Sequence, residues 1–188
     1  VVWARGTPRA ADSVAAAIEG CVLAVAATAR HRELRHETTD AHHAASELIA
    51  VAQAGVAAVV FGNETAGLDA DEAAQCRLWA TIPANPEYAS LNLAAAVQVF
   101  AYELRQAAQL AARAPTPAPA AEYAPATHEQ IEALYAHLEA RMRASGFFNP
   151  AVPGRLELRL RRMLLRARLE VEEVNILRGF LKTLERPK

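Results

Sequence analysis

Along positions 1–113, short blocks of apolar residues alternate with longer blocks in which apolar and polar residues are mixed. The short blocks are continuous apolar runs of strand length, which is typical of strands buried on both faces. They are Cys21–Ala29, Val56–Phe61 and Leu78–Ile82. The long blocks have the spacing of helices and follow these runs, at 41–54, at 69–75 and over about 20 residues from position 90. Strands that alternate with helices predict an α/β fold, a parallel sheet with helices on both faces.

Two stretches carry weaker signals. Val1-Val2-Trp3 resembles the end of a strand, and the chain does not begin with Met, so we expect that it lacks its natural N-terminus. Residues 31–40 are polar and contain no apolar run, which predicts a loop.

Three loops are expected at the carboxyl edge of this sheet, where α/β proteins bind their ligands. They are Thr28–Arg30, Gly62–Leu68 and Pro83–Leu91. In the second loop, Gly62 and Gly67 permit a close approach of backbone or ligand that a Cβ would prevent, and Glu64 lies between them. Taken alone, this loop is also typical of a surface turn with a solvated glutamate.

The third loop leads into an apolar helix that has polar residues at its start. Ser90 is explained as the N-cap of the helix. Asn92 would fall in the first turn, where free backbone N–H groups need acceptors, and that role explains it only in part. One face of the helix carries apolar residues at helical spacing, namely Leu93, Val97, Phe100 and Leu104. The other positions are mostly alanine and valine, which predicts a helix buried on both sides.

The last third of the chain has a different composition. Residues 114–126 contain four prolines and many alanines, which predicts a stiff, extended linker between a domain at 1–113 and a unit at 127–188. Thr127 is the expected cap of a helix that runs to about Ala144. Two more helices are expected at 156–168 and 171–185, so the tail is a small all-helical unit.

The net charge of −1 hides an asymmetry between the two parts. Residues 1–126 carry a net charge of −5 and residues 127–188 one of +4. Four arginines of the tail fall on one helical stripe, which suits a phosphate backbone: Arg155, Arg159, Arg162 and Arg166. The alternative is a solvated helix face that pairs with acidic residues of the next helix: Glu170, Glu172 and Glu173.

Several common chemistries lack their sequence patterns. There is no GxGxxG, GxxxxGK[ST] or GxSxG motif. Four histidines without convincing metal spacing lie between the first run and the next helix, so we expect no metal: His31, His36, His42 and His43. Cys21 and Cys76 are interpreted as buried thiols of a reducing compartment. No stretch reaches the roughly 18 apolar residues of a membrane span, and we expect a cytoplasmic protein.

Three segments carry a family resemblance: ATARHREL after the first run, VVFGNETAGL around the second loop, and TIPANPEYASLNLAAAVQVFAYELR around the third. Together they resemble the SpoU/TrmH family of RNA ribose 2′-O-methyltransferases. Within that family they are most similar to the TrmJ-like branch, which modifies position 32 in the tRNA anticodon loop. The resemblance covers about residues 10–110, and the helical tail resembles the C-terminal extension of the same branch.

The resemblance implies the SPOUT fold, whose C-terminal part threads a trefoil knot. It also implies a homodimer, a tRNA substrate, and S-adenosylmethionine held in the knot without any metal. Cofactor contacts are implied at Ala27, Thr28, Ala29, Gly62, Ile82, Ala89, Ser90 and Leu91. Catalytic positions are implied at Glu64, Ser90 and Asn92. We expect Arg30 and the arginine stripe of the tail to contact tRNA.

One family motif, an Asn-x-Gly-x-x-x-Arg stretch near the N-terminus, is absent from this sequence. The family places its arginine at the attacking hydroxyl, and Arg5 and Arg9 lack the context of the motif. We therefore expect a tRNA 2′-O-methyltransferase without its N-terminal part, inactive or impaired as it stands. One alternative is a non-catalytic RNA-binding and dimerisation module with the same fold. Another is a different doubly wound α/β enzyme.

Overall fold

The computed structural model describes residues 2–4, 7–29, 37–85, 87, 91–113, 124–149, 151 and 155–185. The chain divides into two compact units, Val1–Ala121 and Glu122–Lys188. Residues 114–123 of the expected linker lie outside the described residues.

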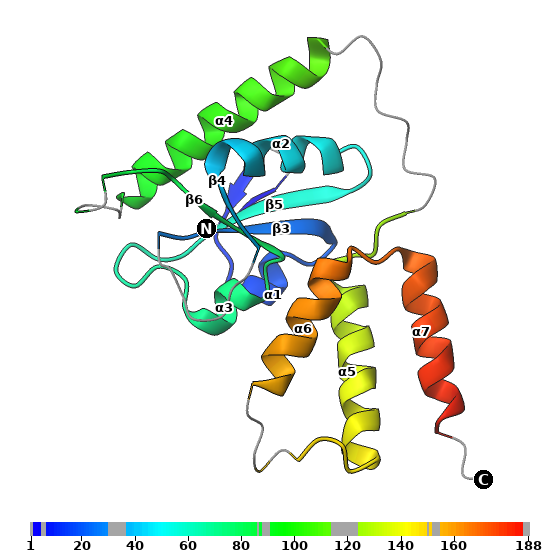
Figure 1. Cartoon of the computed structure of the whole chain (residues 1–188). Coiled ribbons are helices and arrows are strands. Elements are labelled where there is room, and N and C mark those ends of the chain that lie inside the picture. The colour runs from blue at the N-terminus through cyan, green and yellow to red at the C-terminus, as the bar shows by residue number, and fades with distance from the viewer. Residues whose placement is uncertain are drawn as a thin grey trace. The chain divides into compact units, whose positions relative to one another are not determined.

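The first unit is built on a six-stranded sheet with the strand order β2-β1-β5-β3-β6-β4 (Figure 1). Its four neighbouring strands β5, β3, β6 and β4 run parallel, which confirms the predicted class of fold. The bounds of these strands are Cys21–Ala27 for β3, Glu37–Asp40 for β4, Val56–Phe61 for β5 and Leu78–Thr81 for β6. Because the strands are parallel, their carboxyl ends meet at one edge.

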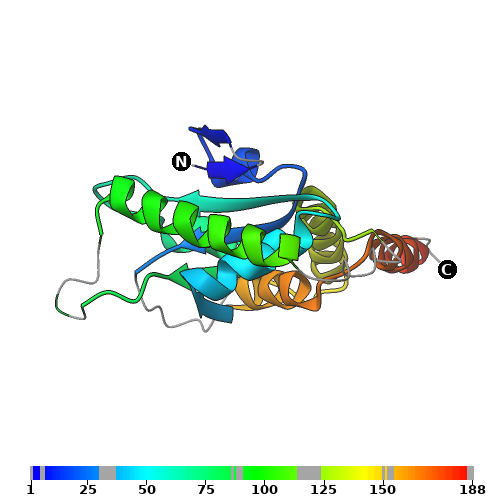
Figure 2. The ribbon, with the colours of Figure 1, turned by 90° about the horizontal axis from the view of Figure 1, so that it is seen from above.

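The N-terminal strands add an antiparallel hairpin that the sequence did not predict. β1 (Val2–Ala4) pairs antiparallel with β2 (Thr7–Arg9) and also with β5. Figure 2 shows this hairpin at one edge of the sheet. β1 and β2 pair antiparallel because the segment between them is short. A parallel pair would need a crossover of a dozen or more residues.

The strand β4 corrects the prediction of a loop over residues 31–40. Residues 37–40 pair in parallel with β6, from Glu37 opposite Leu78 to Asp40 opposite Thr81. β4 is the edge strand of the sheet, and Glu37 and Thr38 are exposed. The strands buried on both faces were predicted from their continuous apolar runs. An edge strand is partly exposed and needs no such run, so this signal was absent from residues 37–40. Residues 31–36 lie outside the described part of the chain.

Helices cover both faces of the sheet (Figure 1). One face carries α2 (Ala41–Val51) and α4 (Leu93–Arg113), and the other carries α1 (Val14–Ala17) and α3 (Ala70–Ala74). On the α3 side, the buried Trp79 Nε1 donates a 2.8 Å hydrogen bond to the backbone oxygen of Ala73, which fastens α3 to β6.

The two cysteines are buried free thiols, as predicted. Burial raises the pKa of the Cys76 thiol to about 12, with a smaller contribution from nearby Cys21. A thiol with such a pKa stays protonated at neutral pH and is a poor nucleophile.

α4 is buried on one side only, so the prediction of a helix buried on both sides was wrong. Phe100 is completely buried, and Leu93, Val97 and Leu104 pack partly buried against the same core cluster. Tyr102 and Leu110, in contrast, are 57% and 60% exposed. In a single copy of the chain, part of this apolar helix therefore meets solvent.

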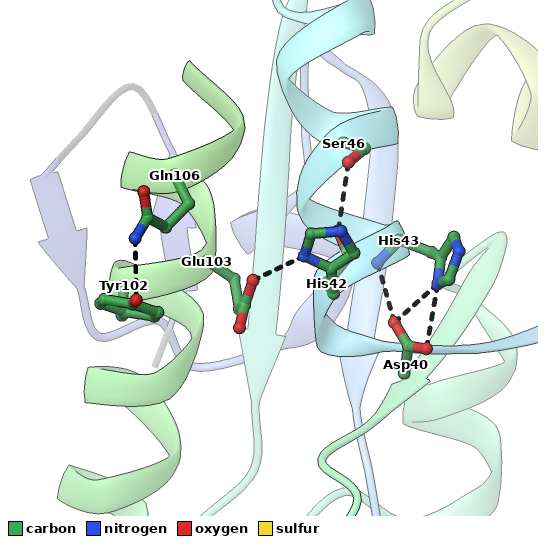
Figure 3. Close-up of polar contacts among 7 residues, drawn as sticks. All are labelled: Asp40, His42, His43, Ser46, Tyr102, Glu103 and Gln106. Atoms are coloured by element: carbon green, nitrogen blue, oxygen red, sulfur yellow. Dashed lines mark hydrogen bonds and ion pairs between the residues drawn. The ribbon is translucent and has the colours of Figure 1, made fainter. Parts of the chain in front are cut away.

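A polar contact joins α2 to α4 near the start of α2 (Figure 3). The His42 Nδ1 atom lies 2.8 Å from the Glu103 Oε2 atom. The neighbouring His43 instead folds back onto the N-cap residue Asp40, whose carboxylate accepts a 2.8 Å hydrogen bond from the His43 backbone N–H. This backbone hydrogen bond is the main cause that lowers the pKa of Asp40, so the cap stays ionised at neutral pH.

The second unit contains three helices, α5 (His128–Ala144), α6 (Leu156–Ala167) and α7 (Val171–Thr183), close to the predicted bounds. Thr127 precedes α5, and its backbone N–H donates a 2.9 Å hydrogen bond to the Gln130 side chain, as a capping box predicts. The core of the unit joins residues of all three helices: Ile131, Leu134, Tyr135, Leu164, Leu165, Val174 and Leu181. Among the described residues, no helix is long and apolar enough to cross a membrane.

Candidate functional site

A cavity of about 250 Å³ lies at the carboxyl edge of the parallel strands in the first unit. Its walls come from three segments that are far apart in the sequence. These are the end of β3, the loop after β5, and the chain after β6 together with the first turns of α4. They belong to the three loops that the sequence analysis assigned to this edge.

The predicted site residues divide into three groups. Those that line the cavity are Ala27, Thr28, Ala29, Gly62, Glu64, Ile82 and Leu91. Arg30, Ala89 and Ser90 lie outside the described residues. Asn92 is described, but it does not line the cavity and instead begins α4.

The floor of the cavity is aromatic, which the sequence analysis missed. Phe61, the last residue of β5, meets Phe100 of α4 edge to face, with ring centroids 5.4 Å apart and an interplanar angle of 86°. Both rings belong to the core and also line the cavity. The apolar pattern identified both as core residues, but only the packing of α4 on the sheet brings them together beneath the pocket.

Gly62 allows two parts of the second loop to touch through their backbones. A Cβ atom built on Gly62 would lie 2.0 Å from the carbonyl carbon of Gly67 and 2.1 Å from the backbone nitrogen of Leu68. No side chain fits in that space. Gly67 favours glycine for a different reason: its φ is +69°, a backbone conformation that residues with a Cβ atom rarely adopt.

Asn63 closes the same loop with hydrogen bonds. Its Oδ1 atom accepts from the backbone N–H of Ala66 at 2.6 Å, and its backbone oxygen accepts from Gly67 at 2.9 Å. The chain therefore turns back tightly, with the exposed Glu64 and Thr65 at its tip along the cavity wall. Sequence reasoning did not assign Asn63 a role, although asparagine is a typical turn residue.

The cavity wall at the end of β3 is held by a hydrogen bond that extends the sheet. The backbone N–H of Thr28 donates a 3.0 Å hydrogen bond to the backbone oxygen of Ala80, one residue beyond the end of β3. Thr28 and Ala29 therefore follow β3 to the cavity in a defined position.

Asn92 caps α4 and positions the third wall. Its Oδ1 atom accepts a 2.7 Å hydrogen bond from the backbone N–H of Ala95, and its backbone oxygen accepts from Ala96. The assignment of this cap to Ser90 was wrong, because α4 begins later than the sequence indicated, at Leu93. Since Leu93 and Ala96 line the cavity, the cap also orients the cavity wall. The amide nitrogen of Asn92 takes no part in this cap.

The lining of the cavity carries little formal charge. Of the described residues that line it, Glu64 is the one with a formal charge. A positively charged group that enters the cavity would meet a carboxylate at the loop tip and an apolar floor below. Across the part of the chain that the structure describes, no three His, Cys, Asp or Glu side chains are grouped so that they could hold a metal ion.

The arginine stripe is exposed in part: Arg162 is half-buried, and Arg155 and Arg162 each have an interaction partner. Arg159 and Arg166 are exposed, and within the described residues neither forms an ion pair with a carboxylate. One of the acidic residues weighed as their partners, Glu173, accepts a hydrogen bond from the backbone N–H of Glu170 at the start of α7. Arg161, on the inner side of α6, pairs with Glu132 of α5 at 2.9 Å.

Two family models match the chain. The model described as the SpoU rRNA Methylase family matches residues 7–102, and that described as tRNA methyltransferase TrmJ, C-terminal domain, matches residues 129–188. The parallel sheet with its edge cavity and the helical second unit together place the chain in the class of SpoU-type RNA methylases.

Individual relatives agree with this class. Two proteins named tRNA (cytidine/uridine-2′-O-)-methyltransferase TrmJ, from Cronobacter sakazakii and Klebsiella pneumoniae, are 41% and 42% identical over 181 residues. Each comparison covers 96% of this chain and 74% of the relative. The chain belongs to the SpoU methylase family and, within it, to the TrmJ group, which confirms the resemblance drawn from its sequence.

Solved structures show the same relationship. The crystal structure of TrmJ from Z. mobilis ZM4 has a TM-score of 0.75 and 33% identity, and the match covers 95% of this chain and 74% of that one. A probable methylase family protein from Haemophilus influenzae Rd KW20 has a TM-score of 0.51 and 34% identity, with 93% of this chain and 70% of that one covered.

The two loop glycines provide a matched test of the backbone contact at the cavity. We expect Gly62→Ala to lower the free energy of unfolding by about 3 kcal/mol or more, because the new methyl group would overlap backbone atoms that cannot move aside. Gly67→Ala adds a methyl group in open space, and should lower that free energy by only about 1–2 kcal/mol through its positive φ. Urea denaturation followed by tryptophan fluorescence measures both values. Equal losses would contradict the proposed difference between the two positions.

Proposed function

We propose that the chain is an S-adenosylmethionine-dependent tRNA ribose 2′-O-methyltransferase that acts on cytidine or uridine 32 of the anticodon loop. The observation that supports this most directly is the cavity itself, because its three walls come from the three segments whose sequences resemble the family. Relatives at 41% and 42% identity carry a name that specifies 2′-O-methylation of cytidine or uridine in tRNA.

The residues of the cavity fit this cofactor. When bound, S-adenosylmethionine supplies a methyl group that is activated by a positively charged sulfonium. Phe61, Leu93 and Phe100 offer an apolar surface to its adenosine part, as in most ligand pockets. Glu64 offers a negative charge at the loop tip. The small residues of the walls let backbone N–H and C=O groups approach the ligand closely.

Methyl transfer to ribose depends above all on how the two reacting groups are positioned. A ribose 2′-hydroxyl is a weak nucleophile, so most of the rate gain comes from holding its oxygen in line with the methyl group. In this proposal the Asn92 amide nitrogen donates a hydrogen bond to the ribose, and the Glu64 carboxylate accepts one from it. Ser90 lies two residues before Asn92 in sequence and acts with it. General acid–base assistance would add to this positioning.

The proposal includes a homodimer in which the exposed face of α4, with Tyr102 and Leu110, meets a second copy. Burial there would cover the large apolar side chains of α4 that are exposed in a single copy. We further propose the trefoil knot of the family, a catalytic domain at 1–113, a linker at 114–126, an RNA-binding extension at 127–188, and action in the cytoplasm. Arg30, which follows Ala29 in the sequence, would add an RNA contact.

The reaction and the binding step can be tested separately. The 188 residues contain no Asn-x-Gly-x-x-x-Arg stretch, so we expect them to bind S-adenosylmethionine but to transfer methyl groups slowly or not at all. Calorimetry measures cofactor binding. Mass spectrometry of unmodified tRNA measures ribose methylation at position 32, for this chain and for a fusion that carries the motif-bearing segment of a relative.

We expect both proteins to bind the cofactor and only the fusion to methylate tRNA at a robust rate. A robust rate with the 188-residue chain would refute the proposed impairment. A folded fusion that binds tRNA but not S-adenosylmethionine would support the alternative, a non-catalytic RNA-binding and dimerisation module.

Two substitutions of Asn92, made in the fusion, separate its cap from its proposed contact with ribose. Asn92→Asp keeps the cap oxygen but removes the amide donor, so it should leave stability nearly unchanged and lower the methylation rate by about 10²-fold. Asn92→Ala removes both groups and should also cost about 1 kcal/mol of stability. Thermal unfolding and single-turnover methylation provide the two readouts. If Asn92→Asp is fully active, the role of Asn92 is limited to the cap.

The arginine stripe predicts a salt-dependent contact with tRNA. Replacing Arg159, Arg162 and Arg166 by Gln should weaken tRNA binding and reduce the slope of log affinity against log salt by about 2–3. Arg178→Gln with Lys182→Gln, two exposed basic residues of α7, is the matched control. Filter binding at several salt concentrations provides the data. Unchanged affinity in the triple variant would mean that the stripe is only a solvated helix face.

A further inference from the structure

The turn between α5 and α6 exposes the aromatic side chain of Phe147, which has no part in the proposed function. Phe147 is 71% exposed, whereas the adjacent Phe148 is 4% exposed. A single exposed apolar residue is common and needs no explanation by itself. The surroundings of Phe147, however, combine a rigid support with exposed positive charge.

The support comes from the residues on both sides of Phe147. The Phe148 backbone N–H donates a 3.1 Å hydrogen bond to the Met142 oxygen, and the Gly146 N–H donates one of 3.1 Å to the Arg143 oxygen. The buried Phe148 ring also lies beneath the Arg143 guanidinium, whose central carbon is 5.2 Å from the ring centroid. Because its neighbours are anchored, the Phe147 backbone is held while its ring faces solvent.

The positive charge comes from the start of α6. Arg143, near the end of α5, lies 3.9 Å from the carboxylate of Glu157 in the first turn of α6. The α5–α6 turn and the beginning of the arginine stripe are therefore at the same end of the helical unit. Arg155 and Arg159 stand on either side of Glu157 in sequence and are exposed. The nearby carboxylates of Glu139 and Glu157 both face Arg143.

We propose that Phe147 is a stacking platform for an unpaired base of an RNA loop, with the adjoining phosphates bound by Arg155 and Arg159. The inference rests on the proposed tRNA binding and deepens it, because it specifies unpaired bases as what the second unit recognises. Proteins that bind single-stranded RNA combine aromatic side chains, on which bases stack, with arginines that follow the backbone.

An RNA partner fits this corner better than a protein partner. The exposed apolar surface is one ring rather than a continuous face, and its exposed neighbours on α6 are cationic. A polyanion with flat, unpaired bases complements both features. The exposed apolar residues of α7, among them Ile176 and Phe180, form a broader surface without this arginine stripe, and Phe180 at 61% exposure serves as a control.

The test measures binding by the full 188-residue chain. The variants are Phe147→Ala, Phe147→Trp and the control Phe180→Ala, each first checked for an unchanged midpoint of thermal unfolding. The probes are an unmodified tRNA and a fully paired RNA duplex of similar length. We expect Phe147→Ala to weaken tRNA binding by about 5- to 100-fold, the range typical of a lost base–aromatic stack. Phe147→Trp should restore affinity, and Phe180→Ala should not change it.

Two further readouts distinguish stacking from a general loss of contact. Phe147→Ala removes no charge, so the salt dependence of tRNA binding should keep its slope, and affinity for the duplex should stay the same. Equal weakening on tRNA and duplex would overturn the stacking role. A change in oligomeric state instead of RNA affinity would overturn it in favour of a protein contact.

The inference and the proposed function fail in different ways. If the unaltered chain binds tRNA and Phe147→Ala binds it equally well, the stacking platform is refuted while tRNA binding stands. If the unaltered chain does not bind tRNA at any salt concentration, both are refuted.

Discussion

The backbone contact between Gly62 and the Gly67–Leu68 segment is the constraint on which the cavity depends. β5 ends at Phe61, and the loop can return onto the strand end only because Gly62 presents no Cβ atom to that segment. Asn63 closes the turn, and the buried Leu68 anchors its far end in the core. A protein interior is packed as closely as a crystal, so a contact of this kind leaves no room for a larger residue.

The same residues hold the core together and shape the cavity. Phe61 and Phe100 contribute to the main core cluster, and their rings are also the cavity floor. α4 packs against α2, which the contact between His42 and Glu103 reinforces, and its first turns form the third wall. A change in α4 therefore affects folding and ligand binding together. Asn92 is a clear example, since its oxygen caps the helix whose first turns form the third wall.

The two units differ in their charge and in what they offer a partner. The first has a cavity with a single charged lining residue among those described, and the core rings of Phe61 and Phe100 line part of it. The second has a small core, with cations on the outer side of α6 and an exposed ring at the α5–α6 turn. In the proposed function, a small cofactor needs an enclosed site and a polyanion needs an open, cationic surface, and these needs place opposite demands on burial. Placing the site and the surface in separate units meets both demands.

Features that depend on local burial could be read from the sequence. β3, β5 and β6 are buried on both faces, so each appears as an apolar run, and the capping box at Thr127 is a local pattern. Three features required the tertiary structure. The polar strand β4 exists because β6 supplies its hydrogen bonds, and α4 is exposed on one side because no described residue of the first unit covers it there. The aromatic floor exists because two distant core residues, Phe61 and Phe100, meet only when α4 packs on the sheet. For β4 and for the aromatic floor the deciding neighbour is far away in the sequence, so local composition could not reveal either feature.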